Sequence, residues 1–321
     1  MARPLIIDTD AGPDDLLAIL YLLGDSTLKI EAITVVSGLT TNLPLAGKVL
    51  RYILEYTGNP GIPVYLKTAA AEDGGNPGPP GGHQCPAAWA NKIEKLGWPD
   101  PKQPAVSSGA VDFLAQRLAE PTKRQMLALG PLTSIADALA LHHKRISINP
   151  PPCAPIQLTI MGGAFGENGQ PAEGNMGDAV PAAPNSEFNI YIDPVAAQRV
   201  LQQGTFEQIL LVPLNACNMV PLDEGFIDEF NDISSSDPRT ELAKTVLSSI
   251  LANNPDMTNY FAWDPLAAMP AALVQPYASS AVVVDDLGVT ASRGDSGPIS
   301  VALKADRAVF KSRFFQRFGA V

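Results

Sequence analysis

The run Leu5-Ile-Ile-Asp-Thr-Asp-Ala-Gly-Pro-Asp-Asp-Leu-Leu-Ala18 decides how this chain begins to fold. Its apolar triplet at 5–7 predicts a buried strand, and the apolar stripe at 16–23 predicts a helix that leads away from it. Four carboxylates stand between these elements, at Asp8, Asp10, Asp14 and Asp15. The last two, beside a proline, suit a first helical turn, but the first two have no structural reason there. Because like charges this close repel, the run indicates a hard cation at the strand-to-helix junction.

Strand and helix patterns alternate along the rest of the chain. We expect strands near 30–37, 62–65, 126–129, 157–161, 190–192, 209–212, 281–285 and 299–303. We expect helices near 44–56, 108–118 (capped by Ser107 or Ser108), 134–142 and 194–203, followed by a helical region up to about 273. This alternation predicts an α/β fold with a mainly parallel, Rossmann-like central sheet and helices on both faces. No clear linker interrupts residues 1–321, so we expect a single large domain.

Two long segments lack this alternation. Residues 67–104 include the run Gly-Gly-Asn-Pro-Gly-Pro-Pro-Gly-Gly, and residues 162–186 are rich in Gly, Pro, Ala and Asn. Loops of this length in a compact α/β domain are commonly lids or binding loops. Ligands of open α/β sheets bind beyond the carboxyl ends of the strands. We therefore expect both segments to be lid-like loops at that edge.

Composition excludes several classes of function. The net charge is −11 and no basic block occurs, so a nucleic acid polymer is not an expected partner. The three cysteines are widely spaced and form no Cys-x-x-Cys pair, which argues against a zinc site and for free thiols in an intracellular protein. The chain has no signal-peptide pattern and no apolar run long enough to span a membrane, so we expect a soluble, cytoplasmic protein.

Other polar residues are candidates for the same edge. Asp264 stands at the start of an expected helix, where it could also be only a cap. Glu187 and Asn189 lie two apart on a segment expected to be extended, and would then point to the same side. Asn175 and Asn185 lie in the second loop. His83 follows two glycines in the first loop and is kept as a catalytic candidate beside its reading as a solvated loop residue.

The run Asp8-Thr-Asp-Ala-Gly-Pro-Asp-Asp15 resembles the Asp-x-Asp-x-Gly-x-Asp-Asp signature of the nucleoside hydrolases. These enzymes cleave the N-glycosidic bond of ribonucleosides with a bound calcium ion. Four later blocks are similar to those of the family and occur in the same order: Leu127-Ala-Leu-Gly-Pro-Leu-Thr-Ser-Ile-Ala, Ile160-Met-Gly-Gly, Glu187-Phe-Asn-Ile-Tyr-Ile-Asp-Pro and Ala262-Trp-Asp-Pro-Leu-Ala-Ala. The resemblance therefore spans most of the chain.

The resemblance implies a set of site residues. The calcium ligands would be the carboxylates of Asp10, Asp15 and Asp264 and the backbone carbonyl of Leu129, an oxygen set that suits Ca²⁺. Asp10 would also be the general base for a calcium-bound water. The substrate contacts would come from Asp14, Met161, Asn175, Glu187, Phe188, Asn189 and Asp264. Of the two loop asparagines, Asn175 is preferred for the 5′-hydroxyl. Asp8 would support the metal loop from behind.

The departing base must accept electrons, and Trp263 is placed to stack on it. Purine-preferring members have tryptophan before the last metal aspartate, so we expect a preference for purine nucleosides. The family also implies a homodimer or homotetramer, with a role in nucleoside salvage or catabolism. One position departs from the family, because Leu39 stands where many members have asparagine; Asn42 is a candidate to replace it.

Two other classes of function remain open at this point. The Asp8-Thr-Asp start also resembles haloacid-dehalogenase-like phosphatases, which use Mg²⁺, and Asp285-Asp286 could be their late acidic motif. Gly12 occupies a position where those enzymes usually have Thr or Val. The other alternative is a calcium-dependent protein that binds ribose or nucleosides without turnover.

Overall fold

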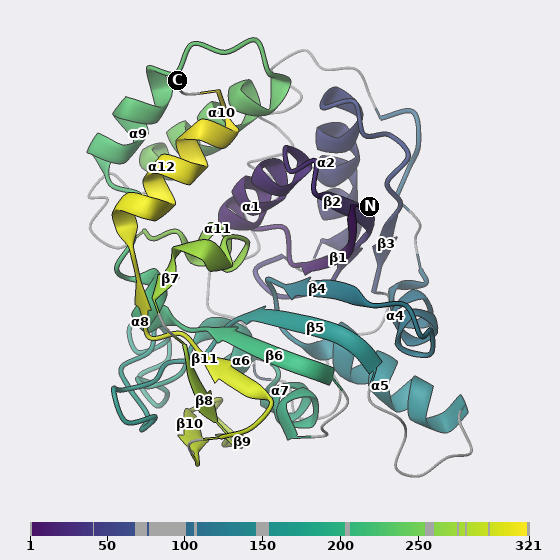
Figure 1. Cartoon of the computed structure of the whole chain (residues 1–321), viewed down its shortest axis with the longest axis vertical. Coiled ribbons are helices and arrows are strands. Elements are labelled where there is room, and N and C mark those ends of the chain that lie inside the picture. Colours follow the sequence, from purple (N-terminus) through teal and green to yellow (C-terminus); the bar gives the residue numbers. More distant parts are fainter. Residues whose placement is uncertain are drawn as a thin grey trace.

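A parallel sheet forms the centre of the computed structural model (Figure 1). The structure describes residues 2–40, 42–67, 76, 101–105, 108–145, 154–202, 206–253, 260–274, 276–279, 281–294 and 296–319. Within these residues the sheet has eight strands in the order β3-β2-β1-β4-β5-β6-β11-β8, and all are parallel except β8. The strands are β1 (Arg3–Thr9), β2 (Leu28–Val35), β3 (Val64–Leu66), β4 (Arg124–Ala128), β5 (Ala154–Met161), β6 (Phe206–Val212), β8 (Tyr277–Ser279) and β11 (Ile299–Val301).

The sheet is covered on both faces because its central strands are apolar on both faces. Ile7 of β1 belongs to the same buried cluster as α1 (Pro13–Leu23), α2 (Leu43–Tyr56) and α10 (Pro238–Asn253). The adjacent Ile6 belongs to a second cluster with α4 (Ala110–Leu118), α5 (Thr133–Arg145) and α7 (Pro194–Gln202). Successive residues of a strand point to opposite faces, so neighbouring isoleucines enter different cores. The predicted α/β architecture is confirmed.

The remaining elements are short or lie beside the sheet. The helices are α6 (Phe188–Ile192), α8 (Leu214–Cys217), α9 (Glu224–Asn231), α11 (Trp263–Ala267), α12 (Arg307–Arg317) and the 3-10 helix η2 (Pro270–Ala272). The strands are β7 (Leu273–Val274), β9 (Ala281–Val284), β10 (Thr290–Arg293) and β12 (Lys304–Ala305). No helix among the described residues combines the length and apolarity needed to cross a membrane.

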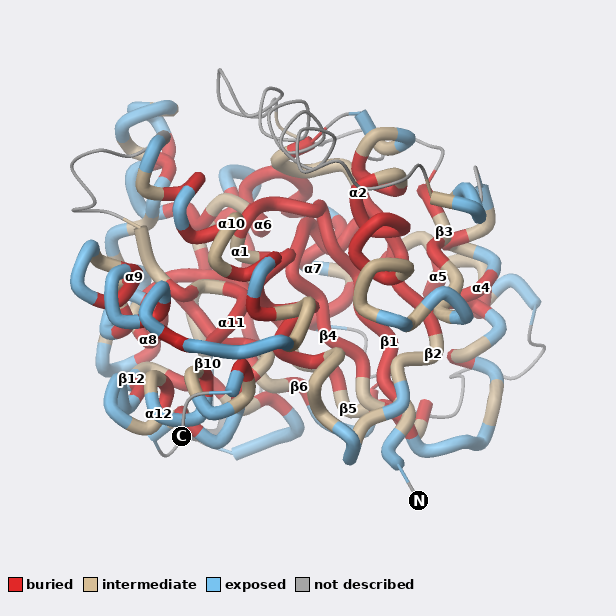
Figure 2. Tube along the Cα trace, turned by 90° about the horizontal axis from the view of Figure 1, so that it is seen from above, coloured by how far each residue is buried: buried red, intermediate tan, exposed pale blue. Residues whose placement is uncertain are grey.

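The order of the strands reverses between β1 and β4, although both strands run in the same direction. From β1 the order runs outward to β2 and β3 on one side and to β4, β5 and β6 on the other. At such a switch point the loops leaving the two strands diverge and leave room for a ligand. Figure 2 shows that the trace through these central strands and α1 is buried, with exposed segments around it. The residues that follow β1 and β4, Asp10 and Leu129, therefore lie at the centre of the carboxyl edge.

Two local predictions are wrong. The segment 190–192, expected as a strand, belongs to helix α6, because the Glu187 side chain accepts the amides of Asn189 and Ile190 and so caps a helix. Glu187 and Asn189 thus share a helix N-terminus and not an extended segment. Helix α4 has Gly109 as its N-cap, with φ +109°, in place of a serine; Ser107 lies outside the described residues.

The two predicted loops differ in how much is described. Residues 162–186 contain no helix and no strand beyond isolated bridges. Most of 67–104 lies outside the described residues, including His83. Asn76 is described, and it contacts the end of α6. Its backbone N–H donates to the Ile192 carbonyl at 2.9 Å, and its side-chain NH₂ donates to the Tyr191 carbonyl at 2.8 Å. The lid-like role of both loops stays a prediction.

Candidate active site

A cavity of about 440 Å³ opens beyond the carboxyl ends of the central strands. Its lining contains each predicted site residue except His83, which lies outside the described residues. These residues are Asp10, Asp14, Asp15, Leu129, Met161, Asn175, Glu187, Phe188, Asn189, Trp263 and Asp264. They come from sequence positions up to 254 residues apart (10 to 264), and the fold brings them to one place.

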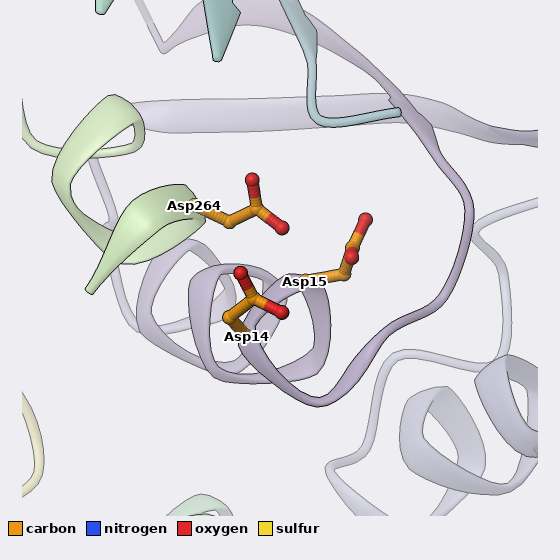
Figure 3. Close-up of side chains that lie close together, drawn as sticks. All are labelled: Asp14, Asp15 and Asp264. Atoms are coloured by element: carbon orange, nitrogen blue, oxygen red, sulfur yellow. The ribbon is translucent and has the colours of Figure 1, made fainter. Parts of the chain in front are cut away.

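Three carboxylates of the lining form a tight group (Figure 3). Asp14 and Asp15 lie in the first turn of α1, and Asp264 lies at the start of α11, which packs against α1. Their nearest oxygens all lie within 4.8 Å of one another. The N-terminal ends of two helices therefore present their acidic side chains to a common point.

The loop between β1 and α1 is shaped to aim these groups. Ala11 adopts a left-handed conformation with φ +59°, which turns the chain sharply after Asp10. Asp15 folds back over this turn, where it accepts the Gly12 amide at 2.9 Å and the Thr9 hydroxyl. Asp10 accepts the amide of Leu39, from the loop after β2, at 2.7 Å. Backbone and side-chain donors thus orient Asp10 and Asp15.

Burial strongly perturbs this acidic group. The pKa values of Asp10, Asp15 and Asp264 are raised, and that of Asp14 is raised to about 7, chiefly because burial disfavours the charged forms. Neighbouring carboxylates add repulsion that raises the pKa of Asp14, Asp15 and Asp264 further. No positive side chain of the described lining offsets the negative charge of these buried carboxylates. Clusters of acids with strongly raised pKa values are commonly functional sites.

The donors present suit a hard cation. The described cavity lining contains carboxylates, amides and a backbone carbonyl but no lysine, arginine or histidine. Oxygen ligands of this kind are those of Ca²⁺ and Mg²⁺, whereas zinc favours nitrogen and sulfur. The closest group consists of Asp14, Asp15 and Asp264; Asp10 lines the same cavity but is not one of these three. The acidic cluster therefore could bind a metal ion.

The cavity lining also contains two polar side chains that hydrogen-bond to the backbone, Glu187 and Asn189. Glu187 accepts the amides of Gly163 at 3.1 Å and Asn189 at 2.9 Å, and its pKa is raised to about 7 by burial. The Asn189 side chain donates to the carbonyls of Leu129 at 3.0 Å and Met161 at 3.3 Å. A carbonyl oxygen has two lone pairs, so Leu129 keeps one for another partner.

The other candidate residues differ in where they lie relative to the cavity. Asn175 lines the cavity, and its side-chain oxygen accepts the Phe188 amide at 2.9 Å, whereas Asn185 is exposed and not part of the lining. Asn42 caps α2 by accepting the Leu45 amide at 3.2 Å, so it does not replace Leu39 in the cavity. Asp285 accepts two amides of its own turn, from Leu287 and Val289. Asp8 is buried and does not line the cavity, and the Thr34 hydroxyl donates to it.

Several residues of the lining were not predicted as site residues from the sequence, and Tyr260 is the most notable of them. Its hydroxyl donates to Asp14 at 3.3 Å, and its ring meets that of Trp263 edge-on, with centroids 4.9 Å apart. The aromatic run Tyr260-Phe-Ala-Trp directly before Asp264 was a visible signal. Pro13, Leu39, Met176, Ala179 and Ile250 complete the lining.

Comparison with known proteins gives the arrangement a context. A family model described as inosine-uridine preferring nucleoside hydrolase matches residues 5–312. A pyrimidine-specific ribonucleoside hydrolase of Salmonella paratyphi C is 31 % identical over 246 residues, which are 73 % of this chain and 68 % of the relative.

Solved structures agree on the fold. An inosine-uridine preferring nucleoside hydrolase from Bacillus anthracis matches with a TM-score of 0.77 at 21 % identity, over 99 % of this chain and 100 % of that one. A purine-preferring ribonucleoside hydrolase from Gardnerella vaginalis matches with a TM-score of 0.75 at 22 % identity, over 98 % of each chain. At these identities the structural matches establish a shared fold.

Proposed function

Because this chain belongs to the inosine-uridine preferring nucleoside hydrolase family, whose members hydrolyse the N-glycosidic bond of ribonucleosides, we propose that it releases ribose and free base from nucleosides, purine nucleosides above all. The observation that carries this proposal is the convergence of Asp10, Asp14, Asp15 and Asp264 with Glu187 and Asn189 in one cavity. The phosphatase alternative loses its support, because neither Asp285 nor Asp286 lines the cavity that contains Asp10.

We propose that the metal ion is Ca²⁺, held by Asp10, Asp15, Asp264 and the Leu129 carbonyl. The clustering of Asp15 and Asp264 supports this set, as does the all-oxygen lining. When bound, calcium supplies positive charge that balances the carboxylates and makes a neighbouring water more acidic. Asp10, held by the Leu39 amide, accepts the proton of the attacking water as general base.

The remaining residues of the cavity bind and stabilise the sugar. Asp14 and Asn189 accept and donate hydrogen bonds at the ribose 2′- and 3′-hydroxyls, while Glu187 and Asn175 hold the 5′-hydroxyl. Phe188 and Met161 pack against the sugar. As the C1′–N bond breaks, positive charge builds on the ribose, and the surrounding carboxylates stabilise it.

The base leaves toward the aromatic side of the cavity. Trp263 lines the cavity beside Asp264, and its indole is large enough to stack on a purine. The Salmonella relative is named as pyrimidine-specific, while the Gardnerella structure is named as purine-preferring. We propose the purine preference on the strength of Trp263. His83 stays a candidate catalytic residue outside the described part of the chain.

The experiment is product release from inosine, adenosine, uridine and cytidine, with and without a calcium chelator. Asp10→Ala is the variant, because it removes the proposed general base, which is also a proposed calcium ligand, while leaving the group of Asp14, Asp15 and Asp264 in place. We expect ribose and free base from the purine nucleosides, with loss of turnover on chelation and in the variant. Faster release from uridine and cytidine would contradict the purine preference. Turnover that survives in D10A would contradict the role of Asp10.

A further inference from the structure

Tyr260 connects two parts of the cavity that the proposed reaction uses separately. Its hydroxyl donates to Oδ1 of Asp14 at 3.3 Å, and its ring packs edge-on against Trp263. Asp14 lies on the sugar side and Trp263 on the base side. A single side chain therefore touches both the carboxylate assigned to the ribose and the indole assigned to the base.

The backbone around Tyr260 is itself fixed. The Tyr260 carbonyl accepts the Leu222 amide at 3.0 Å, and the Ala262 amide donates to the Val220 carbonyl at 2.9 Å. Pro221 and Phe261 form an isolated antiparallel bridge between these two bonds. The segment that carries Tyr260 is thus paired with residues 220–222, and this pairing fixes the backbone position of the tyrosine.

Asp14 needs a neutral hydrogen-bond donor of this kind. Asp15 and Asp264 lie within 4.8 Å of it, and the negative charge of Asp10 disfavours its charged form. Asp14 is partly exposed, whereas Asp15 and Asp264 are buried, so Asp14 is the most accessible of these three carboxylates. A hydroxyl that donates to Oδ1 orients the carboxylate without adding charge to the cavity.

We propose that Tyr260 is a positioning residue that acts through Asp14. It fixes the orientation of the sugar-binding carboxylate relative to the Trp263 indole. This inference rests on the proposed function, in which Asp14 binds the ribose diol. Tyr260 does not supply a proton to the departing base in this scheme. Its effect is on the sugar and is independent of the leaving group.

A pair of substrates distinguishes the two roles. Inosine has a leaving group that must be protonated or otherwise stabilised, whereas 4-nitrophenyl riboside releases a nitrophenolate that leaves without a proton. Loss of a positioning hydrogen bond to Asp14 lowers turnover of both substrates. Loss of a proton donor lowers turnover of inosine alone.

The test compares Tyr260→Phe with wild type and with a matched control, Tyr56→Phe. The Tyr56 hydroxyl also donates to a carboxylate, at 2.6 Å to Glu241, on the outside of the molecule and away from the cavity. For Y260F we expect kcat/KM to fall about 10- to 100-fold on inosine and nitrophenyl riboside alike, as for the loss of one hydrogen bond to a charged group. The Y56F variant should match wild type on both substrates.

A double-mutant cycle locates the effect. In an Asp14→Asn background, Y260F should change the residual kcat/KM on nitrophenyl riboside by less than about twofold, because the pair no longer exists. Thermal unfolding of Y260F near the wild-type temperature excludes a general loss of structure. Calorimetric binding of ribose, which needs no turnover, should weaken in Y260F but not in Y56F.

The inference is overturned if Y260F equals wild type, if only inosine turnover falls, or if Y260F and D14N act additively. These outcomes differ from failure of the proposed function, in which the wild-type protein itself releases no ribose from either substrate.

Discussion

The backbone amide of Leu39 donates a hydrogen bond of 2.7 Å to Oδ2 of Asp10, the carboxylate proposed as general base. The loop after β2 and the loop after β1 therefore meet at one oxygen. The residue before Leu39 must lack a side chain, since a Cβ on Gly38 would lie 2.2 Å from the same oxygen. Asp10 is held by a backbone group and confined by a glycine.

We predict that Gly38→Ala displaces Asp10 and lowers kcat roughly 10²-fold, as small misplacements of catalytic groups do. Gly61→Ala is the matched control, because a Cβ there meets nothing within 4 Å. Steady-state kinetics on inosine, with circular dichroism to confirm folding, measure the difference. Equal activity of G38A and G61A would mean that the position of Asp10 is not critical.

The Leu39 contact also changes how the departure from the family at this position is interpreted. Because the amide and not the side chain holds Asp10, we predict that Leu39→Asn retains the hydrogen bond and most of the activity. The measurement is kcat/KM for inosine in L39N and in wild type. A large gain in the variant would instead indicate that the leucine side chain limits the grip on the sugar.

Much of this fold could be predicted because its signals are local. The apolar run at 5–7 and the carboxylates after it indicated a strand, a loop and a helix, and β1 and α1 occupy these places. Asp264 was identified through the family blocks. Its closeness to Asp14 and Asp15 depends on α11 packing against α1, across about 250 residues, and no local pattern encodes that contact.

The errors also have a physical origin. Residues 190–192 are β-branched and aromatic, which favours a strand in isolation. Glu187 overrides that preference by accepting the amides of Asn189 and Ile190, a capping arrangement whose geometry the residue types alone did not reveal. Tyr260 was missed because its role depends on meeting Asp14 in space, 246 residues away.

Removal of metal gives a prediction on stability. Asp14, Asp15 and Asp264 repel one another without a cation, so calcium should raise the unfolding temperature and a chelator should lower it. The stabilisation should be larger at pH 8 than at pH 6, because calcium needs the charged forms of Asp10, Asp15 and Asp264, whose pKa values burial raises, and favours the charged form of neighbouring Asp14, whose pKa is raised to about 7. Differential scanning fluorimetry at both pH values, with Asp264→Asn as the control that weakens the site, measures this. Equal shifts in D264N and wild type would place calcium elsewhere.

Glu187 gives a prediction on pH. Its pKa is raised from 4.5 to about 7 in the folded protein, so between these values the folded state keeps a proton that the unfolded chain has released. Stability contributed by this group is therefore full below pH 4.5 and is lost as pH rises toward 7, by about 3 kcal/mol. Glu187→Gln should reduce that slope in chelator-treated protein by the share of this one group, measured by urea unfolding across the range; Asp8 and Asp14, whose pKa values are also raised to about 7, keep their own share. Glu167→Gln, a substitution of an exposed residue in the loop that precedes Glu187, is the matched control.

Substitution of the two loop asparagines tests whether Asn175 contacts the substrate or only supports the fold. Asn175 lines the cavity and Asn185 is exposed, so we predict that Asn175→Ala lowers kcat/KM for inosine about tenfold and that Asn185→Ala has no effect. The Asn175 oxygen already accepts the Phe188 amide, and its side-chain NH₂ is the donor proposed for the 5′-hydroxyl. A substrate without that hydroxyl, 5′-deoxyinosine, should therefore be turned over by N175A almost as well as by wild type. If N175A loses the same activity on both substrates, Asn175 acts by holding Phe188 and α6 in place, and the 5′-hydroxyl contact belongs to Glu187 alone.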